Sequence, residues 1–365
     1  MAERIRLGII GASPTVGWAH RSHLPAIVAS PEFELTAVCT TRMETANESA
    51  RQYGARLVFD DYQKMLEHPE IDAVAVVLRV PAHYQITKDA INAGKHVFTE
   101  WPLGRTLEEA EELAALARSK GVNVVVGLQA RAAPAMLQMK QLVEEGYVGE
   151  IVSCSMRLVR GGVLARPSER TWQRDDDLGA TTLTIAAGHS IDALRFVAGD
   201  FSEVSAVVST QVPEWLETDT QQLLDVTAPD NILINGRLAN GAVVSAHVAS
   251  IPWAGSGYRL EIYGREGTLV ATAEDSPQLG SVRLQGASHG DELEEMPLSA
   301  DHTYVLEGMP QGAPYNVGQL YYLFGEAIRG EGSRQPDFDT AVDLHRFIEA
   351  IRKASNEKQT VEVLG

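Results

Sequence analysis

The chain has 365 residues, of which 44% are hydrophobic and 22% charged, an ordinary globular composition that argues against extensive disorder. Its 31 basic and 49 acidic residues give a formal net charge of −18. Such an acidic surface repels phosphate backbones, so the composition disfavours nucleic acids and anionic membranes as partners. No apolar run approaches the roughly 20 residues of a membrane span, and no signal-peptide core is visible, so a cytoplasmic location is expected.

The two cysteines, Cys39 and Cys154, are far apart in the chain and show no metal-ligand spacing. Each lies in an apolar run that is typical of a strand. We therefore expect both to be buried as small hydrophobic residues, and we predict no metal site.

The first 127 residues alternate short apolar runs with amphipathic stretches. Strands are expected at 5–10, 33–39, 71–78, 96–100 and 122–126, and helices near 20–30, 44–53, 81–93 and 107–120, with a further helix after Asp60-Asp61-Tyr62. Gly54, Gly94 and Gly121 follow three of these helices, as is common at helix ends. This order predicts a Rossmann domain over residues 1–127, a doubly wound parallel sheet that binds a dinucleotide.

The pattern changes after about residue 150. Strands are expected at 151–163, 203–211, 231–238, 242–250, 258–263, 268–273 and 281–284, and helices at 189–197, 317–329 and 340–355. Asn240-Gly241 is typical of a hairpin turn between two of these strands. The chain is therefore expected to be α/β plus α+β. Residues 128–365 are predicted to form an open, mostly antiparallel sheet domain with C-terminal helices that serves substrate binding and oligomerisation.

A glycine-containing loop follows the first expected strand. Gly11 suits the first glycine of a dinucleotide loop, Ser13 occupies the second position, and Val16, Gly17 and Trp18 lead into the helix. A plain tight turn explains this irregular spacing equally well when the loop is taken alone. Its position as the first β-α turn favours a loop that cradles the cofactor pyrophosphate at a helix N-terminus.

The second strand leads into Thr41 and Arg42. A carboxylate at this point would bind the adenosine ribose hydroxyls and favour NAD. Hydroxyls and a guanidinium suit a ribose 2′-phosphate instead, so the sequence favours NADP over NAD. The alternative is that Arg42 begins a solvated helix and contacts no ligand.

The segment 96–103 contains Glu100-Trp101-Pro102. It resembles the Glu-Lys-Pro segment of the Gfo/Idh/MocA oxidoreductase family, in which the Lys helps to move a proton while a nicotinamide moves hydride. The resemblance implies that Glu100 and Trp101 lie beside the cofactor. An indole cannot exchange a proton near neutral pH, so any activity needs another acid or base. Trp101 is expected either as a wall against a sugar or nicotinamide, or as a packing residue.

Two further segments of the first half are similar to this family. Pro81 and His83 lie in a loop similar to the family's Thr-Pro-Asn loop, which borders the nicotinamide; His83 either contacts the cofactor or only begins a helix. Residues 127–131 resemble the Gly-x-Asn-x-Arg segment, with Gln129 in place of Asn. The resemblance implies that Gln129 and Arg131 contact the substrate.

The second half contains a region similar to the family's substrate-pocket helix. His189 and Asp192 match in register, whereas Ile185 occupies the position of the catalytic Asp. Three residues apart on a helix, His189 and Asp192 share a face, and a carboxylate favours the charged form of a His, which suits an acid or base. The alternative is a buried polar pair without a catalytic role. Upstream, Trp172 and Arg174 are expected either to stack on and bind a sugar or to serve at a strand edge.

Several segments together resemble one branch of the family, the fungal repressor of the galactose regulon. They include residues 17–27, Glu100-Trp101-Pro102 and residues 188–194. That branch keeps the fold and binds a dinucleotide but acts through protein partners.

The residues and the resemblance leave three functions open. The first is an NAD(P)-dependent oxidoreductase acting on a sugar, polyol or glycoside with His189 as acid or base, including redox-neutral elimination through transient oxidation. The second is a non-catalytic sensor that a dinucleotide or sugar controls. The third is a cofactor-binding subunit. A homo-oligomer, dimer or tetramer, is also expected.

Overall fold

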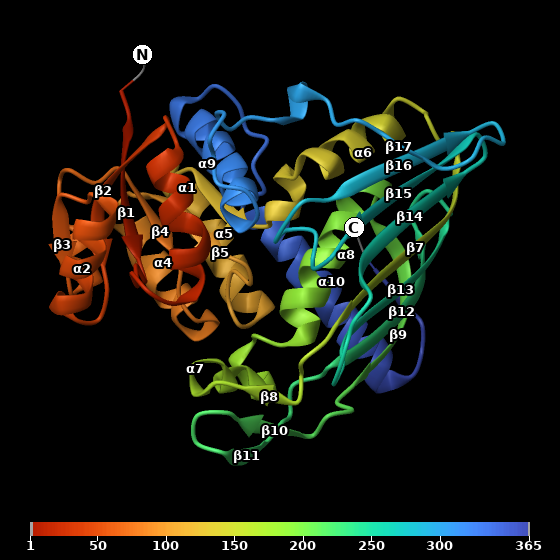
Figure 1. Cartoon of the computed structure of the whole chain (residues 1–365), viewed down its shortest axis with the longest axis horizontal. Helices are drawn as coiled ribbons and strands as arrows, with labels where there is room; N and C mark the ends of the chain where they lie inside the picture. The colour runs from red at the N-terminus through yellow and green to blue at the C-terminus, as the bar shows by residue number, and fades with distance from the viewer. Residues whose placement is uncertain (1–2, 364–365) are drawn as a thin grey trace. The chain divides into compact units, whose positions relative to one another are not determined.

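The structure is a computed structural model that describes residues 3–363, which form two compact units (Figure 1). The first unit runs to Ala132 and takes up Tyr304–Asp343, and the second comprises Ala133–Thr303 and continues from Leu344. The sequence pattern divides the chain only once, at residue 127. That pattern does not show that Tyr304–Asp343 belongs to the first unit. Its place depends on the core against which the apolar face of α9 (Ala313–Arg329) packs, and a local pattern does not reveal this.

The first unit is built on a sheet of six parallel strands. Their spatial order is β3 (Leu57–Phe59), β2 (Phe33–Cys39), β1 (Ile5–Ile10), β4 (Ala73–Val76), β5 (His96–Glu100) and β6 (Val124–Gly127). This is the order of a doubly wound Rossmann sheet: successive strands are added toward one edge from β1 to β3 and toward the other edge from β4 to β6, so the strand order reverses between β1 and β4. The predicted fold of this half is therefore confirmed. Strand β3 was not expected, because its three residues are too few to show a period.

The helices of the first unit follow the expected pattern closely. They are η1 (Ala19–His23), α1 (Leu24–Ala29), α2 (Met43–Tyr53), α3 (Tyr62–Leu66), η2 (Val80–Ala82), α4 (His83–Asn92), α5 (Leu107–Lys120), η3 (Gln129–Ala132) and α9. The side chains of Asp61 and Thr106 cap the N-termini of α3 and α5. Gly54 and Gly121 end α2 and α5 in the left-handed conformation.

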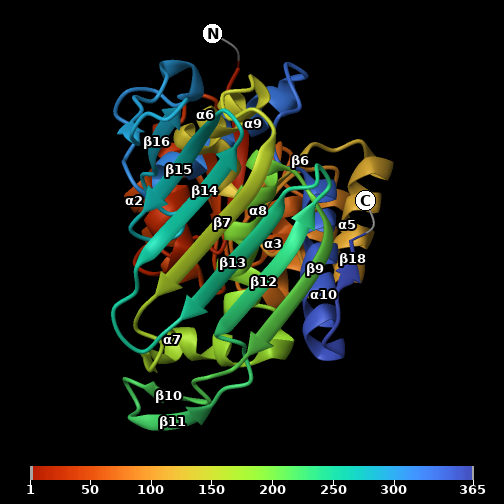
Figure 2. The same ribbon diagram turned by 90° about the vertical axis from the view of Figure 1, so that its right-hand side faces the viewer.

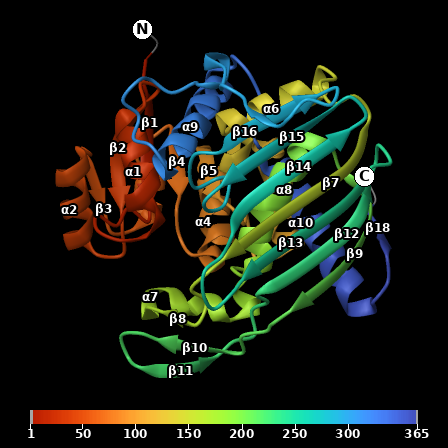
Figure 3. The same ribbon diagram turned by 45° about the vertical axis from the view of Figure 1, so that its right-hand side comes forward.

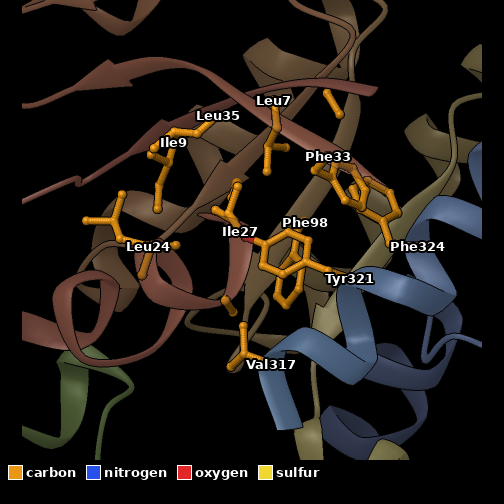
Figure 4. Packing of buried hydrophobic residues seen from close by; sticks show 14 of the residues in the cluster. Leu7, Ile9, Leu24, Ile27, Phe33, Leu35, Phe98, Val317, Tyr321 and Phe324 are labelled. Carbon is orange, nitrogen blue, oxygen red and sulfur yellow. The ribbon is translucent and has the colours of Figure 1, made fainter. Parts of the chain in front are cut away.

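Helix α9 completes the core of the first unit although it is distant in sequence (Figure 4). Tyr321 lies 5.0 Å from Phe98 of β5 between ring centroids, and Phe324 stacks on Phe33 of β2 at 5.8 Å. All four rings are fully buried. Burial of each is worth about 1.5–3 kcal/mol, so α9 belongs to this unit on energetic grounds.

The second unit contains a nine-stranded sheet, seen face-on in Figure 2. Its spatial order is β17 (Glu294–Glu295), β16 (Arg283–Ser288), β15 (Gly267–Ala273), β14 (Gly257–Gly264), β7 (Ile151–Arg160), β13 (Val243–Ser250), β12 (Asn231–Leu238), β9 (Phe201–Ser209) and β18 (Val361–Glu362). Only β7 and β13 pair in parallel, so the predicted mostly antiparallel sheet is confirmed. The predicted hairpin joins β12 to β13, with Gly241 at a φ of 93°.

One face of this sheet is covered by helices (Figure 3). They are α6 (Pro134–Glu144), η6 (Thr182–Ala187), α8 (Gly188–Ala198) and α10 (Phe338–Glu357), the last from Leu344 onward. On the other face the side chains of Val207, Leu233 and Val243 are about half exposed, at 55%, 45% and 49%. Among the described residues, this face of the sheet has no helical cover.

A second, smaller sheet in this unit was not expected from the sequence. It pairs β8 (Ala165–Arg166) with β10 (Glu214–Glu217) and β11 (Gln222–Asp225), and the short segments α7 (Ser168–Thr171), η4 (Trp172–Arg174) and η5 (Asp176–Leu178) follow β8. Trp215 and Val163 are buried in its own small core. Strands of two to four residues carry too little alternation to be predicted.

Some strands begin or end at other residues than the sequence predicts. Strand β16 begins at Arg283 rather than 281, because Arg283 is the residue that pairs with Thr272 of β15. The sequence also did not reveal α6, η7 (Ala300–His302), β17 or β18.

Both cysteines are buried and unpaired, as expected for small hydrophobic residues. Burial raises the pKa of each thiol to about 12, so neither is a thiolate at neutral pH. Within residues 3–363 no His, Cys, Asp and Glu side chains gather in a group of three that could hold a metal. No helix in the same range is long and apolar enough to cross a membrane.

Candidate functional site

A cavity of about 570 Å³ opens in the first unit where its parallel strands end. Gly11 and Ser13 follow β1, residues 40–42 follow β2, residues 60–62 follow β3, and Leu78 follows β4. The cavity therefore lies at the carboxyl ends of the strands, beside the β1–β4 reversal, which is where open α/β sheets bind ligands.

Gly11 sets the shape of the cavity wall. Its φ of 94° favours glycine, and a Cβ here would lie 2.1 Å from the carbonyl oxygen of Val77. The amides of Gly11 and Ala12 both donate to the carbonyl of Cys39, which ties the loop to the end of β2. Only a residue without a side chain therefore lets the loop backbone pack this closely against the segment after β4, at the wall of the cavity.

The residues after Gly11 continue the loop toward η1. Ser13 Oγ accepts from the Val16 amide at 3.4 Å, and Val16 and Gly17 are exposed. Trp18 packs against the core, and its buried indole N–H has no acceptor among the described residues. Gln129 Oε1 is likewise buried without a donor there. Unsatisfied buried groups cost about 1–3 kcal/mol, but neither residue lines the cavity, so the fit to a dinucleotide rests on the Gly11 backbone and the exposed Arg42 at the cavity wall.

Thr41 and Arg42 are both exposed at the cavity edge after β2. Within the described part of the chain the Arg42 guanidinium forms no ion pair, so it is available to an anionic group. The same cavity is also lined by Asp60 and Asp61, of which Asp61 is engaged as the cap of α3.

The Glu100 carboxylate at the end of β5 is buried in a hydrogen-bonded network. It accepts from His23 Nε2 at 2.8 Å and from Gln129 Nε2 at 2.9 and 3.1 Å, while His23 Nδ1 lies 2.8 Å from the Tyr321 hydroxyl. A Cβ at position 127 would lie 2.6 Å from this carboxylate, which is why Gly127 is needed beside it. Glu100 thus fixes the orientation of the His23 ring and of the Gln129 amide. Trp101, the next residue, is 4% exposed.

His83 bridges two loops rather than lining the cavity. Its Nδ1 lies 2.7 Å from the carbonyl of Pro102 and its Nε2 lies 3.0 Å from that of Leu78. Burial lowers the pKa of His83, so the ring is neutral at pH 7 and donates to one carbonyl at a time. Pro81, two residues earlier, is exposed. Arg131 in η3 is half-buried.

In the second unit, η6 and α8 form one continuous helical run from Thr182 to Ala198. Thr181 caps its start reciprocally with Thr184. His189 and Asp192 are both buried on α8, at 5% and 0% exposure. Ile185 precedes His189 by one turn and shares its face.

Trp172 and Arg174 occupy the short η4 segment and are half-buried. Arg174 Nη1 donates to the Asp225 carbonyl at 3.2 Å, and the Arg174 carbonyl accepts from the amides of Thr227 and Ala228. Arg174 therefore joins η4 to the end of β11 and to the segment that follows it, a position at a strand edge, which was one of the two expectations for this residue.

Several residues of these environments were missed by sequence reasoning. His23 and Tyr321 are separated by 298 positions, so no spacing could indicate their contact. Asp60 and Tyr62 were seen only as the start of a helix. Arg166, Arg170 and Trp215, which line a second cavity described below, belong to no sequence motif that could have indicated them.

Two family profiles match separate parts of the chain. One described as "Oxidoreductase family, NAD-binding Rossmann fold" matches residues 5–128, and one described as "Gal80p, C-terminal domain" matches residues 134–273. The dehydrogenase aclE of Aspergillus oryzae is 31% identical over 376 residues, covering 98% of both chains.

Solved structures agree with both matches. The super-repressor mutant of Gal80p from Saccharomyces cerevisiae superposes with a TM-score of 0.87 at 24% identity, covering 99% of this chain and 98% of that chain. Levoglucosan dehydrogenase, in complex with NADH and levoglucosan, gives a TM-score of 0.86 at 25% identity with full coverage (100%) of both chains. The levoglucosan dehydrogenase of Pseudarthrobacter phenanthrenivorans is 28% identical over 394 residues, covering 99% of this chain and 98% of its own.

Gly11→Ala is expected to abolish dinucleotide binding and to destabilise the protein, because its Cβ meets the Val77 carbonyl. Gly54→Ala is the matched control: Gly54 ends α2 outside the cavity with a similar φ of 81°, but a Cβ there meets nothing within 4 Å. The control should lose only the left-handed strain of about 1–2 kcal/mol. Urea unfolding and a fluorescence titration with NADH and NADPH measure both effects; equal losses of stability in the two variants would contradict the close approach.

Proposed function

Because the chain belongs to the Gfo/Idh/MocA oxidoreductase family, with its NAD-binding Rossmann fold, we propose that it is an NAD(P)-dependent dehydrogenase acting on a sugar, polyol or glycoside. The observation that carries the proposal is the cavity at the β1–β4 reversal, with the Gly11 backbone exposed to it. The dehydrogenase aclE and levoglucosan dehydrogenase, relatives that match nearly the whole chain, support this choice.

The first unit would hold the cofactor through its loop and strand ends. Gly11, Ser13, Val16, Gly17 and Trp18 would surround the pyrophosphate, where the N-terminus of the following helix favours an anion. Thr41 and Arg42 would meet the adenosine ribose. Around the nicotinamide we place Pro81, His83, Glu100 and Trp101, with Glu100 acting through the neighbours that it orients.

When bound, a nicotinamide accepts or returns the hydride of a carbinol carbon. The hydroxyl proton then needs an acceptor, and we assign it to His189, oriented by Asp192 on the same helix. The family's Lys and Asp positions hold Trp101 and Ile185, which cannot take a proton. Gln129, Arg131, Trp172, Arg174 and Trp101 would position the substrate.

A non-catalytic regulator is the second candidate. The match of residues 134–273 to the C-terminal domain of Gal80p favours it, as do the apolar residues at two family proton-transfer positions. In that case the dinucleotide would control a surface that another protein recognises.

The proposed dehydrogenase is tested with purified protein, NAD⁺ and NADP⁺, against sugars, polyols and glycosides, reading products by mass spectrometry and reduced nicotinamide by absorbance. A product that needs the cofactor but leaves no reduced nicotinamide identifies redox-neutral elimination. His189→Ala should lower turnover by about 10²–10⁴-fold, the usual contribution of an acid or base, with dinucleotide affinity unchanged. Tight dinucleotide binding without any product across the panel would favour the regulator, and an unchanged rate would remove His189 from the mechanism.

Arg42→Gln is expected to weaken NADP⁺ binding by about 10- to 100-fold, because a charged hydrogen bond to the 2′-phosphate is lost, while NAD⁺ binding stays the same. Arg51→Gln is the control, since Arg51 is exposed on α2 and does not line the cavity. Calorimetric titration of both cofactors gives the comparison. A similar loss of affinity for NAD⁺ would show that Arg42 does not read the phosphate.

We also propose that the uncovered face of the nine-stranded sheet joins copies of the chain. Val207, Leu233 and Val243 are exposed on neighbouring strands of this face, and such apolar patches mark association surfaces. Light scattering should give a dimer or tetramer mass, and Leu233→Glu with Val207→Glu should reduce it to one chain. A monomer mass for the unaltered protein would overturn this assembly.

A further inference from the structure

A second cavity, of about 210 Å³, lies wholly within the second unit. Arg166 of β8 forms part of its wall, with Trp215 of β10 beside it and Ile185 of η6 on another side. The volume exceeds that of a single small ion, since one water occupies about 30 Å³ in the liquid. It can therefore take part of a sugar-sized molecule.

Arg166 is a half-buried cation without a carboxylate partner among the described residues. Its Nη1 donates to Gln173 Oε1 at 2.8 Å, and its guanidinium stacks on the Trp215 ring 4.0 Å from the centroid. Burial, followed by the charges of Arg170 and Arg160, lowers the pKa of Arg166 to about 10, so the group is still charged at neutral pH. Removing a charge from water without a counter-charge is costly.

The indole of Trp215 independently indicates that this cavity can bind a hydrogen-bond acceptor. Its side chain is 4% exposed, and its buried indole N–H has no acceptor within the described range of the chain. Buried Trp N–H groups normally find one. Within residues 3–363 the Trp215 N–H thus has no acceptor and the neighbouring Arg166 has no negatively charged one, and an anion would supply both.

Further charged residues line the same cavity. They are the arginines Arg160 and Arg170, of which Arg170 Nη2 donates to Gln173 Oε1 at 3.4 Å, and one carboxylate, Asp230. Arg160 is paired with Asp275 at 2.8 Å. Asp230 accepts from the amides of Gln211 and Val212 and from Asn231 Nδ2, so its oxygens are committed to the backbone and a neighbouring side chain.

We propose that this cavity binds an anionic substituent of a carbohydrate, a carboxylate or a phosphate, through Arg166, Arg170 and the Trp215 N–H. The planar guanidinium fork matches both oxyanions, and charge-assisted bonds are the stronger ones. Calling this ligand a substrate rests on the proposed dehydrogenase; the binding itself does not. Ile185 lines the cavity one turn before His189, so a sugar anchored there by its anionic group lies against the helix that carries the proposed base.

The test is calorimetric titration of the full chain, with and without dinucleotide, so that binding is read independently of turnover. The probes are glucuronate, glucose 6-phosphate, glucose and inorganic phosphate. We expect one acidic sugar to bind at least 10-fold more tightly than glucose and than inorganic phosphate, and its identity distinguishes carboxylate from phosphate. Arg166→Gln and Arg170→Gln should each weaken this binding by about 10- to 100-fold.

Two variants control for charge and for folding. Arg265→Gln removes one exposed positive charge at the β14–β15 turn, away from the cavity, and should bind as the unaltered protein does. Arg166→Lys keeps the charge without the fork and should bind with intermediate affinity. Arg170 is exposed, so its variant reports on binding even if loss of Arg166 impairs folding.

Equal affinity for glucose and the acidic sugars would overturn the inference. Binding of inorganic phosphate as tight as that of the acidic sugars, an adventitious ion only, would overturn it too. Anion binding that depends on Arg166 without any product in the dehydrogenase assay would leave the inference standing and remove the proposed activity.

Discussion

The buried carboxylate of Glu100 is the constraint around which the first unit is arranged. A charge at 8% exposure is tolerable only when it is hydrogen-bonded on every side, and here His23 and Gln129 supply the donors. His23 in turn lies against the Tyr321 hydroxyl. One side chain at the end of β5 thereby links η1 and the segment after β6, and through His23 it is connected to helix α9.

This network determines what the neighbouring residues can do. Trp101 directly follows Glu100 and is buried. The residue that matches the family's proton-transferring Lys is therefore a packed indole. His83 is held just as firmly between the carbonyls of Leu78 and Pro102. For the proposed dehydrogenase we therefore expect the proton acceptor on another element, and His189 is the residue that we propose.

The predictable parts of the structure are those governed by local patterns. The strand over His96–Glu100, the helix over Leu107–Lys120 and the Asn240-Gly241 hairpin follow from periodicity, a glycine stop and turn chemistry, and all three are present. The return of α9 to the first core, the His23–Tyr321 contact and the short sheet of β8, β10 and β11 depend on pairings between distant segments. The two contacting segments are in each case too far apart in the chain for a local pattern to include both. The sequence could therefore identify the glycine loop, which is local, but not the cavity lined by arginines, which distant segments form.

The apolar residue at the family's catalytic Asp position and the arginine cavity are physically connected. Ile185 lines the same cavity as Arg166, and an aspartate there would add a second carboxylate to a wall that already holds Asp230. Such a carboxylate would compete with an anionic ligand for the guanidinium and reduce the positive potential of the cavity. An isoleucine leaves the arginine fork to the ligand and lowers the local dielectric, which strengthens that bond. In a chain with a net charge of −18, each further acid in the lining would reduce the attraction of this cavity for an anion.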